Sequence, residues 1–183
     1  GQTAVIEMAS CAGLPLVEDR KDPRLTTTYG VGQLILAAAG KGVKKIIVGL
    51  GGSSTNDGGC GAAAAAGIRF YDRGGREFIP TGGTTADIDR IDLSGRDSLL
   101  EQVEIVTMCD IDNPMYGPAG ASFIFGPQKG ADEAMVLQLD EGIRNLSRAI
   151  AQATGTDISQ VPGTGAAGAM GIMAVRRKDG KHR

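Results

Sequence analysis

The sequence predicts a single α/β domain over residues 1–183, with three layers and a largely parallel or mixed sheet whose strands end in glycine-rich loops. Three observations support this fold class. Short apolar runs alternate with helical patterns along the chain. Lys44–Leu50 is a continuous, β-branched run, as in parallel strands buried on both faces. The chain has 29 glycines and only 4 % aromatic residues, so aliphatic residues and alanine must form its core.

The first part of the chain predicts two strands separated by a helix. Thr3–Met8 is a short apolar run that we expect to be a buried strand, and the polar stretch Pro15–Pro23 is expected to be a surface loop. The threonines at 26–28 offer N-cap hydroxyls for a helix that ends near Gly40. Lys44–Leu50 follows as the clearest strand.

The next part predicts a β-loop-α-β unit. The glycine-rich loop Gly51–Gly61 leads into an alanine helix that reaches Ala66, and Ile68–Tyr71 is the next expected strand. Val103–Met108 is expected to be a further strand that runs into an acidic loop.

Two helices are expected in the last third of the chain. Ala131–Ala153 has apolar residues at helical spacing and predicts a long helix with one apolar side. The glycine- and alanine-rich segment Gly163–Ala174 is expected to pack closely against its neighbours. No internal repeat is visible.

Composition excludes several classes of protein. A net charge of −2 offers neither a field for nucleic acid nor a polybasic membrane patch. The three cysteines, at positions 11, 60 and 109, have no paired spacing, and the one histidine lies in the basic tail, so neither structural zinc nor a disulfide framework is expected. Without a membrane-length apolar run or a signal-peptide pattern, the expected compartment is the cytoplasm.

Both ends of the chain resemble interior points of a longer protein. The sequence opens at Gly1 without a methionine and enters the apolar stretch Ala4–Ile6 almost at once, as a strand in mid-domain would. We therefore expect further sequence to belong to the same protein.

The first candidate site is the loop Gly49–Gly59, which has five glycines in eleven residues and a polar run in its middle. Backbone N–H groups of such a loop, between a strand and a helix, can bind an anion. Its hydroxyls, with Asn56 and Asp57, would orient a polar ligand. The alternative is a tight turn in which Asn56 or Asp57 simply caps the following helix.

The second candidate is Cys109–Pro114, at the end of an expected strand. Asp110 and Asp112 lie where ligands collect in open α/β sheets, and paired carboxylates suit Mg²⁺ or a general base. The alternative is an ordinary turn formed by Asp112 and Asn113 before the proline.

Two further segments carry weaker indications. Lys129 lies in a constrained turn, Phe125–Gly130, where a lysine could neutralise a phosphate or carboxylate, or could simply be solvated. The hydroxyls of Thr26–Gly30 could bind the carboxylate of a small acid, or could serve only as an N-cap.

Two nucleotide-binding motifs are absent or incomplete. The P-loop is missing, because Gly42 follows Gly40 and Lys41 where Ser or Thr is required. The Rossmann fingerprint is imitated by Gly49 and Gly51, with Asp72 at a plausible ribose-binding distance, but Ser54 replaces the third glycine. A Rossmann-like nucleotide-binding domain therefore remains an alternative.

Six motifs in order resemble the glycerate kinase family of bacterial glyoxylate and sugar-acid catabolism. They are Ile6–Leu14, Thr26–Ile35, Ile46–Gly59, Cys109–Pro114, Phe125–Ala131 and Gly163–Gly171. The resemblance implies ATP-dependent transfer of the γ-phosphoryl group to a hydroxyl of glycerate, giving 2-phosphoglycerate, with Mg²⁺ as cofactor. It also implies a two-domain enzyme, of which this chain is the inserted central domain, with the flanking domain absent.

Residue chemistry suggests a role for each candidate, since phosphoryl transfer needs an anion cradle, a metal ligand, a cation and a base or orienting group. We expect Asp57, Asp110 and Lys129 to be catalytic and Asp110 and Asp112 to bind metal. The expected substrate- and phosphate-binding residues are Gly51, Gly52, Ser53, Ser54, Asn56, Thr27 and Thr28. A non-catalytic metabolite-binding module derived from the kinase is the remaining alternative.

Overall fold

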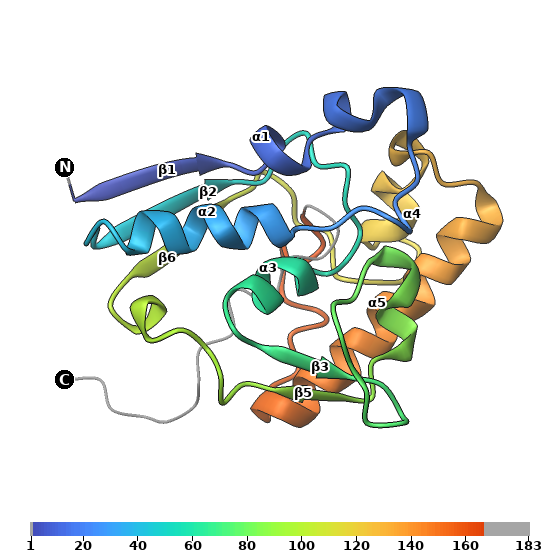
Figure 1. The fold of residues 1–183 in the computed structure, drawn as a ribbon. Helices are drawn as coiled ribbons and strands as arrows, with labels where there is room; N and C mark the ends of the chain where they lie inside the picture. The colour runs from blue at the N-terminus through green and yellow to red at the C-terminus, as the bar shows by residue number, and fades with distance from the viewer. Residues whose placement is uncertain (1, 167–183) are drawn as a thin grey trace.

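A computed structural model describes residues 2–166 as an α/β fold with two three-stranded sheets (Figure 1). The first sheet is parallel and has the strand order β1-β2-β6, formed by β1 (Thr3–Glu7), β2 (Lys45–Gly49) and β6 (Glu104–Met108). All three strands lie within segments that the sequence predicts as strands. The predicted α/β class and its parallel sheet are therefore confirmed.

Helix α2 (Tyr29–Ala39) covers one face of this sheet, as Figure 1 shows. Ile6, Ile46 and Val48 point to this face and form a buried cluster with Val31 and Ile35 of the helix. The alternation of buried and less buried residues along β1 and β2 follows from the two-residue period of a strand.

The opposite face of the sheet is less well covered. The parallel register aligns Val5, Ile47 and Val106, and the side chain of Val5 is 69 % exposed. The expectation that Thr3–Met8 is a buried strand is thus right only for the face that contacts α2. Its other face carries exposed residues because no described element covers β1 there.

The second sheet is antiparallel, with the order β4-β3-β5, and corrects the predicted β-loop-α-β unit. Strand β3 (Arg69–Tyr71) does form within the predicted range, but it pairs with β4 (Glu77–Phe78) and β5 (Arg90–Asp92) instead of joining β2. The turn after β3 is tight enough for a hairpin, so local pairing replaces a parallel crossover.

The second sheet has its own core against α5 (Glu133–Thr154). Phe70, Ile88, Ile143 and Leu146 are all buried there. The long helix was predicted at nearly the same bounds, because its apolar residues recur at helical spacing. Asp132 caps it by accepting a hydrogen bond from the amide of Met135 at 2.8 Å.

Helix α3 (Cys60–Ala65) joins the two cores. Ala62 belongs to the first cluster, whereas Cys60 and Ala63 belong to the second. Its approach to α2 depends on small residues, since a Cβ added to Gly32 would collide with the backbone of Ala62. The alanine- and glycine-rich composition therefore reflects close helix packing.

The remaining elements are short. They are α1 (Ala9–Ala12), α4 (Ala121–Phe125) and the 3₁₀ helices Leu14–Arg20, Gly82–Asp87, Ser98–Glu101 and Pro127–Lys129. The first 3₁₀ helix corrects the loop predicted over Pro15–Pro23, since proline is well tolerated in a first helical turn. The helix expected over Gly163–Ala174 lies for the most part outside the described residues.

Candidate active site

The glycine-rich loop and the loop after β6 meet at the carboxyl ends of the parallel strands, where they enclose a cavity of 170 Å³. The cavity is open on one side. Its lining comprises Leu50, Gly51, Gly52, Ser53, Met108, Cys109, Asp110, Ile111, Phe125, Gln128, Lys129 and Ala166. Ligands favour this end of an open α/β sheet. The structure thus brings together the candidates Gly51, Gly52, Ser53, Asp110 and Lys129.

Three successive backbone amides of the loop are available to a ligand. Among the described residues, the N–H groups of Gly51, Gly52 and Ser53 donate no hydrogen bond, while the amides of Ser54 and Thr55 donate to Ala12 O and Ser53 Oγ. Gly52 has a left-handed φ of 71°, the conformation that one residue of an anion-binding backbone nest adopts. This segment has the features of an anion-binding turn.

Lys129 lies in the wall of the cavity and is only 2 % exposed. Its Nζ donates to the carbonyl oxygen of Thr55 at 2.6 Å, which ties the 3₁₀ turn after α4 to the glycine-rich loop. Burial lowers the pKa of Lys129 from 10.5 to about 8, against the attraction of Asp57. The cavity therefore has a cationic group that the protein solvates poorly.

Asp57 is fully buried, and its carboxylate accepts four hydrogen bonds from the protein. The amide and hydroxyl of Thr28 donate to Oδ2 at 2.8 Å each, and the amides of Gly59 and Gly61 donate at 3.1 Å. Burial raises the pKa of Asp57, and these bonds oppose the rise. The carboxylate links the start of α3 to the segment before α2.

Thr28, Thr27 and Ser54 do not line the cavity. The hydroxyl of Thr28 also accepts from the amide of Ala62 at 2.9 Å, so it joins α2 to α3. Thr27 is exposed and accepts from the amide of Tyr29 at 3.2 Å, and Ser54 Oγ donates to Ala12 O at 3.0 Å. Thr28 and Ser54 therefore hold the loop in place, whereas the hydrogen bond of Thr27 is local to the start of α2.

Asn56 is also fully buried beneath the loop. Its Nδ2 donates to Ser122 Oγ of α4 at 3.0 Å, and its Oδ1 has no hydrogen-bond partner among the described residues. Ser53 Oγ and Thr55 Oγ1 lie 2.9 Å apart. The polar run in the loop therefore organises the loop internally.

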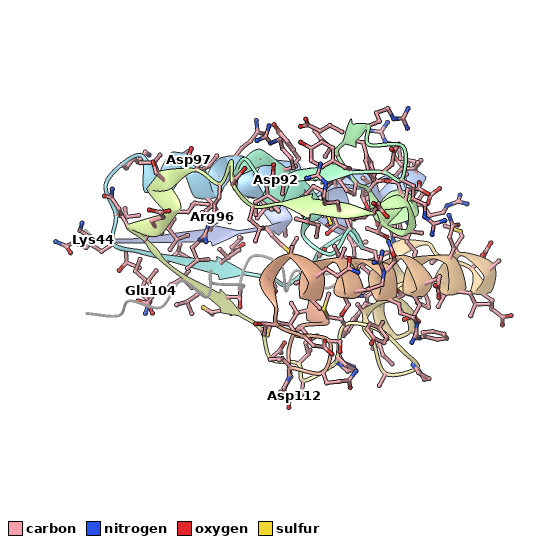
Figure 2. All side chains as sticks on the ribbon, turned by 90° about the horizontal axis from the view of Figure 1, so that it is seen from below. Lys44, Asp92, Arg96, Asp97, Glu104 and Asp112 are labelled. Carbon is pink, nitrogen blue, oxygen red and sulfur yellow. The ribbon has the colours of Figure 1, made fainter. Side chains whose placement is uncertain are left out.

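Asp110 and Asp112, the two aspartates that follow β6, lie in different surroundings. Asp110 is exposed and lines the cavity, whereas Asp112 does not contribute to the lining and points outward from its loop in Figure 2. Within residues 2–166, no group of three or more His, Cys, Asp or Glu side chains is arranged to hold a metal ion. Asp110 is thus a carboxylate at the cavity without a second one beside it.

The Rossmann alternative does not fit the topology. Asp72 lies in the β3–β4 hairpin, where its Oδ1 accepts from the amides of Gly74 and Arg76 at 2.9 and 3.0 Å. These contacts lower the pKa of Asp72. Because β3 does not pair with β2, Asp72 has no ribose-binding position next to the glycine-rich loop.

Sequence reasoning missed several residues of the site. Met108 and Cys109 line the cavity and directly precede Asp110. Their position at the end of an expected strand could have identified them as site residues. Gln128 adjoins Lys129 in the same way. Ser122, which holds Asn56, lies 66 residues from it in sequence, and no local pattern predicts that contact.

The fold and the cavity define a class of protein: an α/β protein with a cavity at the carboxyl ends of parallel strands, lined by a glycine-rich loop and a buried lysine. The model of the Glycerate kinase family matches residues 1–181. The chain belongs to the glycerate kinase family.

Relatives and a solved structure agree with this membership. The chain is 48 % identical to a glycerate kinase of Bacillus cereus, over 95 % of this chain and 46 % of that protein. It is 47 % identical to the glycerate 2-kinase of Escherichia coli, over 93 % and 45 % of the two chains. A Salmonella typhimurium LT2 protein whose crystal structure carries the name glycerate kinase 2 matches with a TM-score of 0.91 and 42 % identity, over 94 % of this chain and 46 % of that one.

The chain thus spans about half the length of the relatives it matches. No helix within the described part of the chain is long and apolar enough to cross a membrane.

Proposed function

We propose that this chain supplies one wall of the active site of an ATP-dependent glycerate kinase, which transfers the γ-phosphoryl group to the C2 hydroxyl of glycerate and yields 2-phosphoglycerate. The observation that carries the proposal is that Lys129 shares one cavity with Gly51, Gly52 and Ser53, whose amides donate no hydrogen bond among the described residues. Phosphoryl transfer depends mainly on positioning and on charge stabilisation, and both kinds of group serve that purpose.

The amides and the lysine act on the anionic oxygens. Backbone N–H groups in a glycine-rich turn can bind a carboxylate or a phosphoryl group, and Lys129 would add positive charge for the developing transition state. Because Lys129 is anchored to the carbonyl of Thr55, its ammonium group is held next to the loop without reorganisation. We therefore assign charge neutralisation to Lys129.

Asp110 is the candidate for the metal or for the attacking hydroxyl. Mg²⁺ in kinases keeps several waters and uses one or two carboxylates together with substrate phosphates. One exposed carboxylate at the rim of the cavity fits that requirement. The Mg²⁺ would supply charge neutralisation on the nucleotide, and Asp110 would hold it or orient the glycerate hydroxyl.

Asp57 and Asp112 receive different roles from those expected from sequence. All the hydrogen bonds of Asp57 come from the protein, so we assign it the positioning of the loop and not proton transfer. Asp112 does not line the cavity and points outward from its loop in Figure 2, so we do not assign it to the metal. We assign Thr28, Ser54 and Asn56 to the support of the loop and give Thr27 no role at the ligand.

The cavity is open on one side, so further polypeptide would be needed to enclose a ligand there. Ligand sites favour domain interfaces, and the relatives are about twice as long as this chain. We propose that a flanking domain of the same enzyme completes the sites for ATP and glycerate.

The test uses a chimera in which this chain replaces the segment that it matches in the Bacillus cereus relative. The chimera is incubated with Mg²⁺-ATP and D-glycerate, and phosphorus NMR follows the product. We expect 2-phosphoglycerate, and at least about a 100-fold lower kcat in Lys129→Met, since loss of one charge-stabilising group costs about 3 kcal/mol. Lys41→Met, at an exposed lysine, is the control.

Two outcomes would contradict the proposal. Formation of 3-phosphoglycerate would contradict the regiochemistry. Full activity in both Lys129→Met and Asp110→Asn would remove the catalytic roles of this wall and leave a metabolite-binding module.

A further inference from the structure

The face of the parallel sheet that lies opposite α2 is apolar at its centre. Val5, Ile47, Val106 and Met108 point to this side, and we name them the Val5 face. Val5 is 69 % exposed and Met108 is 61 % exposed, while Ile47 and Val106 are half-buried. Among residues 2–166 no element covers this row, whereas parallel sheets are normally covered on both faces.

The surroundings of the Val5 face resemble a protein interface. A polar rim borders the apolar row: Lys45 and Glu104 form an ion pair at 3.5 Å on one side, and Glu7 lies on the other. Glu104 and the neighbouring Lys44 mark that end of the sheet in Figure 2. An apolar centre with a polar rim is the usual composition of a stable interface.

Both outer strands of this sheet are edges within the described residues. In the order β1-β2-β6, neither β1 nor β6 has a partner on its outer side. Exposed edges and an exposed apolar face together favour burial against further polypeptide.

We propose that the Val5 face is the surface on which the rest of the full-length protein packs, namely the polypeptide that corresponds to the unmatched half of the relatives. The matched Salmonella chain has more than half of its length outside the aligned part, which is enough for a layer of helices of its own. A covalently attached segment also has a high effective concentration at this face, so it outcompetes a second copy of the chain.

This surface continues into the candidate active site. Met108 belongs to the Val5 face and also lines the cavity. A segment packed on Val5 and Val106 therefore reaches the open side of the cavity and becomes its second wall. Only this link rests on the proposed function, because the packing itself requires no reaction.

The experiment compares Val5→Lys in the isolated chain and in the chimera by thermal unfolding. Val5 is largely exposed in the chain alone, so Tm there should change by less than about 2 °C, whereas a lysine buried at the interface of the chimera should lower Tm by more than about 5 °C. The control is Leu137→Lys, at a position that is 62 % exposed on α5, which should leave both proteins unchanged.

Chemical labelling gives a second measurement that does not depend on destabilisation. Because Cys11 and Cys109 are also exposed, labelling is read at each position by peptide mass mapping. Val5→Cys should react with a maleimide at least about tenfold more slowly in the chimera than in the isolated chain, and Leu137→Cys equally fast in both. Equal labelling of Val5→Cys in the two proteins would overturn the proposal. A dimeric isolated chain that Val5→Lys converts to a monomer would also overturn it, in favour of a second copy.

Discussion

Replacing Lys129 with methionine should stabilise the isolated domain while removing its anion-binding cation. Lys129 is 2 % exposed, and within the described part of the chain its ammonium group has one hydrogen bond, to the carbonyl of Thr55. A buried charge with so few partners opposes folding. Methionine has a similar length and fills the same volume without a charge.

The pKa of Lys129 sets the size of this effect. A fall from 10.5 to about 8 corresponds to about 3 kcal/mol, at 1.36 kcal/mol per pKa step. The substitution also leaves the carbonyl of Thr55 unpaired, which costs about 1 kcal/mol. The net gain at pH 7 is about 2 kcal/mol, or an increase in Tm of about 4–8 °C for a chain of this size.

The gain depends on pH in a direction that identifies its origin. The folded protein releases the Lys129 proton near pH 8, while the unfolded chain keeps it up to pH 10.5, so the stability of the native protein rises with pH between these values. The difference between Lys129→Met and the native protein should therefore be greatest below pH 8 and shrink toward pH 10.

The assay is urea unfolding of both proteins at pH 6.5, 7.5, 9 and 10, with Lys41→Met as an exposed lysine control. Binding of inorganic phosphate, followed by amide shifts of the glycine-rich loop, should weaken at least about tenfold in Lys129→Met. A variant that is less stable than the native protein at pH 7, with a difference that does not change with pH, would refute the reasoning.

Three further predictions concern the loop and its rim. Thr28→Val should lower the free energy of unfolding by about 2–3 kcal/mol, because Asp57 and the amide of Ala62 each lose a hydrogen-bond partner. Thr27→Val, at an exposed position, should lower it by less than about 1 kcal/mol. Equal losses on urea unfolding would contradict this prediction. Gly58→Ala should lower the free energy of unfolding, measured in urea, by more than about 2 kcal/mol, because φ at Gly58 is 64° and the new Cβ collides with Leu146. Gly42→Ala has a similar φ but open space around the new Cβ, so it should lower the same free energy by only about 1 kcal/mol. Asp110→Asn should leave Tm within about 1 °C and lower the kcat of the chimera about 100-fold, and a large fall in Tm would indicate a structural role instead.

Periodic patterns made the main elements predictable. β2, β6 and α5 follow from continuous apolar runs or helical spacing, which are set by local sequence. The antiparallel sheet was not predicted, because β4 has two residues and β5 has three, too few for a pattern. Its formation depends on pairing with β3 and on packing against α5, neither of which is encoded locally.

The site residues that directly follow a strand could be predicted from the sequence. Gly51, Gly52 and Asp110 follow apolar runs directly, and parallel strands bring such positions together. Lys129 was a weaker candidate, because its burial arises from contact with a loop 74 residues away in sequence. Sequence also could not distinguish loop residues that face the ligand from those that hold the loop, since both are polar.

Some polar side chains of the glycine-rich loop fix its backbone and do not face the cavity, which explains why the loop contains so many of them. Gly51 and Gly52 are exposed, so water can pair with their amides when no ligand is bound, and the shape of the loop must come from other contacts. The hydroxyls of Ser53 and Thr55, the carboxylate of Asp57 and the amide of Asn56 all bond within the protein and fix the backbone in that conformation. These buried polar contacts thus hold the backbone in the conformation that the proposed anion site needs. Thr28 does not line the cavity, but it bonds to Asp57, so its substitution should also change the conformation of the glycine-rich loop.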